Sequence, residues 1–83
     1  MILSEAMKRL LELKLKLGNN GIKIEDIQTI DDGNYGYLVV LTKIGEELHN
    51  ELLKLKMKEL NAKQVMPDLW VLGPFLKEEK KED

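Results

Sequence analysis

The chain has 83 residues, which is enough for one small domain and too few for two. Hydrophobic residues make up 43% of it and charged residues 34%, a balance typical of a folded chain. The formal charge of −2 excludes general binding to polyanions, although a local basic face is compatible with it. The lack of cysteine excludes disulfides, thiolate metal sites and cysteine nucleophiles, and the single His49 argues against histidine-based catalysis.

The N-terminal segment MILSEAMKRL has no long apolar stretch, because Glu5, Lys8 and Arg9 interrupt it. We therefore expect no secretory leader. The longest apolar run, residues 37–41, is far shorter than the roughly 20 residues of a membrane-spanning helix. The sequence thus predicts a cytoplasmic protein without a membrane segment. Abundant Lys and Glu beside only two Gln residues form a bias typical of proteins from hot environments.

Residues 3–17 are predicted to form an amphipathic helix with an apolar stripe. Ser4 is a candidate cap at its start, and Gly18 is a candidate left-handed residue at its end. The segment LELKLKL, residues 11–17, also alternates as a strand would. Leu, Glu and Lys favour helices and none of them is β-branched, so helix is the better interpretation. A strand here would overturn every architecture considered below.

Three strands are predicted after this helix. Residues 22–30 are rich in Ile, with a bulge expected near Glu25–Asp26, and a turn at 31–34 leads into a second strand at 35–42. A helix is predicted at 44–60 and a last strand at 64–72, where Pro67 indicates a sheet edge or a bulge. Residues 1–75 then form the single domain, and residues 76–83 form a charged tail that we expect to be disordered.

The predicted fold class is α+β with the order α-β-β-α-β. The strand at 64–72 is expected to run parallel to the one at 35–42, giving a three-stranded mixed sheet with two helices on one face. This arrangement is a truncated ferredoxin-like fold that lacks its first strand. A self-comparison at an offset of 42 residues pairs helix with helix and strand with strand, including Asn19 with Asn61. The identical residues indicate either an internal duplication or a coincidence of the Leu- and Lys-rich composition. In both cases the chain repeats a unit of a helix followed by a strand.

Residues 17–42 resemble the middle of an ACT domain. The resemblance is carried by Gly21, Ile22 and Ile24, by the turn Asp32–Gly33 and by the apolar run 37–41, while Lys23 stands where the family often has Asn. The family binds amino acids at dimer interfaces with a glycine-containing loop between its first strand and first helix. That loop has no counterpart here, so the resemblance implies the fold and a dimer more than a ligand.

A second resemblance points elsewhere. Residues 41–55, LTKIGEELHNELLKL, are similar to the helix entry after the wing of archaeal winged-helix proteins. This resemblance implies a DNA-binding protein whose recognition helix is 3–17, with phosphate contacts from Lys8, Arg9, Lys14 and Lys16. The acidic pair Asp31–Asp32 at the tip of such a wing, and the lack of two preceding helices, speak against it.

The residues themselves suggest association rather than catalysis. The strand at 35–42 is apolar on both faces, so the side away from the helices needs a cover, for which a second copy is the simplest candidate. We expect Tyr35, Tyr37, Val39 and Trp70 at that interface. Trp70 has the alternative of core packing. The turn Asn19, Asn20 and Gly21 is a ligand-binding candidate whose simpler interpretation is a helix C-cap.

No catalytic pair and no set of metal ligands stands out, so we expect neither enzyme activity nor a cofactor. The leading hypothesis is a small regulatory or interaction module that homodimerises and binds a protein partner or a small effector. The winged-helix type of DNA binding is the alternative.

Overall fold

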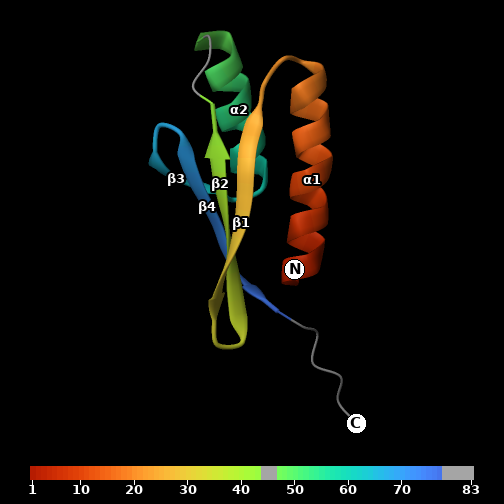
Figure 1. Cartoon of the computed structure of the whole chain (residues 1–83), viewed down its shortest axis with the longest axis vertical. Coiled ribbons are helices and arrows are strands. Elements are labelled where there is room, and N and C mark those ends of the chain that lie inside the picture. Colours follow the sequence, from red (N-terminus) through yellow and green to blue (C-terminus); the bar gives the residue numbers. More distant parts are fainter. Residues whose placement is uncertain (44–46, 78–83) are drawn as a thin grey trace.

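The computed structural model describes residues 1–43 and 47–77. Their elements alternate as helix, hairpin, helix, hairpin (Figure 1). In chain order the elements are α1 (Leu3–Asn19), β1 (Ile24–Asp32), β2 (Tyr35–Thr42), α2 (Glu47–Glu59), β3 (Lys63–Met66) and β4 (Leu69–Leu76). The chain is therefore built from two successive units, each a helix followed by two antiparallel strands.

The strands form one antiparallel sheet of four strands in the order β1-β2-β4-β3. The predicted α+β class with two helices is confirmed, but the predicted three-stranded mixed sheet and the order α-β-β-α-β are wrong. The reason is a tight turn at Pro67–Asp68, which divides the predicted strand 64–72 into β3 and β4, with Met66 opposite Leu69. β4 is therefore the neighbour of β2 and runs antiparallel to it, so the parallel pairing behind the truncated ferredoxin-like arrangement is not formed.

The segment with two competing periodicities, residues 11–17, is helical. α1 buries Ala6, Leu10, Leu13 and Leu17 and leaves Leu11 and Leu15 on the outside, with Leu15 72% exposed. Helix-forming residue types and the apolar face at helical spacing thus outweigh the alternation. The predicted cap at Ser4 is wrong, because the helix begins after Ile2 and Ser4 lies within its first turn.

α1 ends at a left-handed glycine, but that glycine is Gly21 (φ 78°) rather than the predicted Gly18. The Ile22 N–H donates to the Leu17 carbonyl over 2.9 Å and closes the last turn. The end of α2 repeats this arrangement, with Asn61 at φ 57° and the Ala62 N–H donating to the Met57 carbonyl over 3.0 Å. The two helix ends therefore match at an offset of 40 residues, not at the 42 of the sequence comparison.

The core lies between the helices and one face of the sheet. The central strands contribute Leu38 and Val40 from β2 and Trp70 and Leu72 from β4, all at most 3% exposed. Both helices pack against this face, with α2 drawn behind the strands in Figure 1. Further core residues are Ala6, Leu10, Leu13, Leu17, Ile22, Ile24, Leu53 and Met57.

The ends of the elements differ slightly from the prediction. The bulge near Glu25–Asp26 is confirmed, since the β1–β2 register shifts between Ile24 and Asp26. β4 continues to Leu76, and Lys77 forms an ion pair of 3.3 Å with Asp31, so the predicted boundary at residue 75 falls inside a strand. Ile2 adds an isolated parallel bridge to Leu76. The predicted helix start at 44–46 and the tail at 78–83 lie outside the described residues.

Gly73 is the glycine whose replacement the fold tolerates least. Its φ is 121°, and a Cβ there would stand 3.0 Å from the Gly36 carbonyl oxygen. We expect Gly73→Ala to lower the free energy of unfolding by about 1–3 kcal/mol, because an alanine would be strained at this φ and the atom that its Cβ meets belongs to the main chain. Urea unfolding followed by circular dichroism measures the change.

Gly18→Ala is the matched control, since Gly18 lies within α1 and a Cβ there would have no neighbour within 4 Å. Its stability is expected to stay the same or to rise by up to about 1 kcal/mol. Equal stability of the two variants would contradict the assignment of strain to residue 73.

Candidate interaction surface

The side of the sheet that faces away from the helices is apolar at its centre. The β2 side chains alternate between buried positions on the helix side and more exposed positions on the other, where Tyr35, Tyr37, Val39 and Leu41 follow one another. The register places Val71 opposite Val39 and Leu69 opposite Leu41. We call this surface the open face; it comprises Asp26, Gln28, Ile30 and Asp32 on β1, Tyr35, Tyr37, Val39 and Leu41 on β2, Lys63 and Met66 on β3 and Leu69, Val71 and Leu76 on β4.

Several of these side chains are accessible in the single chain. Ile30 is 52% exposed and Tyr35 46%, while Val39, Leu41 and Val71 are half-buried by one another. The charged residues among its members are Asp26 and Asp32 on β1 and Lys63 on β3, so they stand on the two outer strands. A contiguous apolar area with a polar margin is the pattern of an interaction surface.

Three of the four residues expected at the interface lie on the open face, namely Tyr35, Tyr37 and Val39. The fourth does not: Trp70 pairs with Val40, points to the helix side and is 3% exposed. Its indole N–H has no hydrogen-bond partner among the described residues. Alternation places Leu69 and Val71 on the side opposite Trp70, and the pairing of Val71 with Val39 identifies that side as the open face.

The turn that was a candidate ligand site is occupied by its own hydrogen bonds. The N–H groups of Asn20 and Gly21 donate to the carbonyls of Leu17 and Gly18, each over 3.0 Å. The Asn20 side-chain amide donates to the Lys16 carbonyl over 3.0 Å. Asn19 is the last residue of α1. Because the amide groups complete the helix end, the geometry matches a C-cap and leaves no cluster of free donors for an anion.

The four basic residues of the nucleic-acid alternative are all exposed but do not share one face of α1. Arg9 and Lys16 are seven residues apart and lie beside Glu12 along a groove toward α2. Lys8 points outward and Lys14 lies on the opposite flank, as the helical spacing from the buried residues requires. Basic charge on α1 is therefore distributed around the helix.

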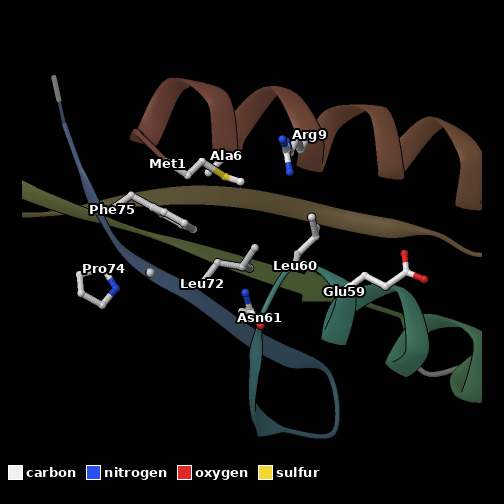
Figure 2. Close-up of a pocket in the computed structure, with 10 residues that line it drawn as sticks. Met1, Ala6, Arg9, Glu59, Leu60, Asn61, Leu72, Pro74 and Phe75 are labelled. Carbon is white, nitrogen blue, oxygen red and sulfur yellow. The ribbon is translucent and has the colours of Figure 1, made fainter. Parts of the chain in front are cut away.

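A hollow of about 330 Å³ lies between α1, the end of α2 and β4. Figure 2 shows Leu60, Leu72 and Phe75 forming its apolar wall, with Arg9 reaching in from α1. A second hollow of about 250 Å³ continues it between the helices and adds Glu12, Lys16 and Lys56. Basic and acidic side chains alternate along this groove, and the Lys56 ammonium lies 3.8 Å from Glu59. Since the groove supplies its own counter-charges, its electrostatics select no particular ligand.

Within residues 1–43 and 47–77, no three His, Asp or Glu side chains gather in a way that would hold a metal ion. Among the same residues, no helix has the length and apolarity needed to cross a membrane. His49 is half-buried on α2, and a Cβ on Gly21 would lie 3.6 Å from its imidazole, so it packs beside the end of α1.

Comparison of the chain with protein-family models, with curated proteins and with solved structures gives no match.

The position of Trp70 has a spectroscopic consequence, since it is the single tryptophan of the chain. An indole that is 3% exposed among Leu and Met side chains should emit at short wavelength and resist quenching by iodide. We expect the emission maximum to stay constant over a wide range of protein concentration. A shift of the maximum on dilution, with the far-UV circular dichroism unchanged, would place Trp70 in an interface after all. Protein unfolded in urea provides the reference for a hydrated indole.

Proposed function

We propose that the chain is a non-catalytic regulatory or interaction module that acts as a homodimer, in which two copies pack through their open faces, and that the dimer binds a protein partner or a small effector. The observation that carries this proposal is the series of apolar side chains Tyr37, Val39 and Leu41 along the central strand β2, with Leu69 and Val71 beside them on β4. No element of the described chain covers these side chains. Burial of such side chains stabilises an association by roughly 25 cal/mol per Å² of apolar surface.

The size of the face fits a second copy. Neighbouring strands are about 4.8 Å apart and rise about 3.3 Å per residue, so the four strands present roughly 20 Å by 20–25 Å. Two such faces packed about 10 Å apart bury about 800–1,000 Å² in total, which is below the roughly 1,200–2,000 Å² of a stable interface and in the range of weak, transient ones. The expected dimer is therefore weak and concentration-dependent, as suits a module whose state responds to a partner or effector.

The ACT resemblance of residues 17–42 supports the same proposal, because domains of that family also work as dimers. Binding of an effector or partner by the dimer is part of our proposal. The groove beside Arg9 and Glu59 remains open on the helical side when the open faces meet, so dimerisation and binding do not compete for one surface.

Val39→Glu tests the interface. The residue lies at the centre of the open face, and a dimer would bring two unpaired carboxylates together in an apolar layer. We expect the dissociation constant to rise roughly 100-fold or more, because a charge buried without a partner is costly. Size-exclusion chromatography with light scattering over a concentration series measures the change.

Leu15→Glu is the matched control, since Leu15 is 72% exposed on α1 and lies away from the open face. This variant is expected to dimerise as the unchanged chain does. A wild-type chain that stays monomeric at high micromolar concentration, or equal effects of the two substitutions, would refute dimerisation through the open face.

A DNA-binding assay distinguishes the proposed module from the winged-helix alternative, which requires binding to duplex DNA. The basic residues of α1 point in several directions around the helix, namely Lys8, Arg9, Lys14 and Lys16. We therefore expect that a gel-shift assay shows no binding to a random DNA duplex at low salt, about 50 mM, where phosphate contacts are strong. Retardation that weakens steeply with salt, and that is lost when these residues are replaced by Gln, would favour the winged-helix type of function.

A further inference from the structure

The two margins of the open face carry opposite charges. We call residues that are paired across neighbouring strands a row. Asp26 on β1 lies in the row of Leu41 and Leu69, whereas Lys63 on β3 lies in the row of Val71 and Val39. The Asp26 carboxylate accepts hydrogen bonds from the Ile27 N–H (3.0 Å) and from the Gln28 side-chain amide (2.9 Å), so it is held beside Gln28 at its margin. Asp32, farther along β1, adds a second acidic group to that margin, whereas the members of the face on β2 and β4 are uncharged. The face is therefore polarised across its strands.

A homodimer through this face has two simple arrangements, since a two-fold axis lying between the packed sheets runs either along the strands or across them. With the axis across the strands, β1 lies over β1 of the partner, and each charged margin meets its own copy. With the axis along the strands, β1 lies over β3 of the partner, and β2 lies over β4.

We propose that the dimer adopts the second arrangement, with its two-fold axis along the strands, so that Asp26 of each copy faces Lys63 of the partner subunit. This inference rests on the proposed function. It makes the open face a surface that recognises a second copy of this chain in one orientation. The apolar centre supplies the affinity, and the charged margins select the orientation, because like charges facing each other are disfavoured.

The geometry allows the contact. An axis along the strands keeps the position of each row, and the rows of Asp26 and Lys63 differ by two residues, which is about 7 Å along a strand. With the sheets about 10 Å apart, the two Cα atoms are then about 12 Å apart, and the lysine and aspartate side chains span most of that distance. Exposed charges interact over a screening length of about 8 Å at physiological ionic strength. The contact occurs twice in a symmetric dimer, so its effect on association is doubled.

Reversing the charges of Asp26 and Lys63 tests the arrangement in which β1 lies over β3 of the partner subunit. Asp26→Lys and Lys63→Asp each turn two attractive contacts into two repulsive ones, and we expect each to raise the dissociation constant about tenfold. The double variant carrying both changes recreates the attraction with reversed sign and is expected to return to within about threefold of the unchanged chain. Sedimentation equilibrium at low and at high salt measures all four proteins, and salt should reduce the differences.

Glu51→Lys is the control for a charge change of the same kind, because Glu51 is exposed on α2 away from the open face. Far-UV circular dichroism and thermal melting establish that each variant folds. Lys63→Asp carries the test alone if Asp26→Lys disturbs β1, where the Asp26 carboxylate accepts a hydrogen bond from the Ile27 N–H.

The outcomes separate the two proposals. A wild-type chain that does not dimerise refutes the proposed function and this inference with it. A dimer that Val39→Glu disrupts but that the charge variants leave unchanged, or that they tighten, retains the open-face interface and refutes the orientation. Single variants that weaken the dimer without recovery in the double variant likewise refute the contact between Asp26 and Lys63 of the partner subunit.

Discussion

The pairing of β2 with β4 is the constraint on which the rest of this structure depends. Leu38 lies opposite Leu72 and Val40 opposite Trp70, which places four large side chains together under the helices. Because side chains alternate along a strand, the same register sends the residues between them to the other side, where they form the open face. A slip of one residue would exchange core and surface across the centre of the sheet. Thr42 supports the register at one end, since both its N–H (2.8 Å) and its hydroxyl (3.3 Å) donate to the Asp68 carbonyl.

The local elements were predictable because their signals are local. α1 is correctly predicted over the alternating leucines, since residue type favours a helix, and β2 has the predicted bounds of 35–42. The strand predicted at 22–30 lies instead at Ile24–Asp32, because it continues two residues into the segment predicted as a turn. The division of the last apolar segment was not predictable in the same way. Pro67–Asp68 is a two-residue connection inside a run that stays apolar on both sides, and a proline there is also compatible with an edge strand. Pairing partners several residues away decide between these alternatives.

The placement of surface residues depends on whether the sequence shows which side of a strand faces the helices. Tyr35, Tyr37 and Val39 were placed correctly because the strand that carries them has a clear alternation and a known helix side. Trp70 is misplaced because its neighbours on both sides are apolar, so the sequence does not show which side of the strand faces the helices; the pairing with Val40 decides it. At the end of α1, two glycines were available within four residues, and the sequence did not show that the helix continues through Gly18 to Asn19 and turns at Gly21.

The repetition of helix and hairpin also bears on how the chain reaches its fold. Within each unit the contacts join residues that are close in sequence, and the turns at Gly21 and Asn61 bring each helix back along its own hairpin. The two units meet in the sheet through the β2–β4 pair, whose partners Leu38 and Leu72 are separated by the whole of α2 and β3. Closure of that longer loop costs more chain entropy than any step within a unit. The open face combines strands of both units, so it exists only when β4 is paired with β2.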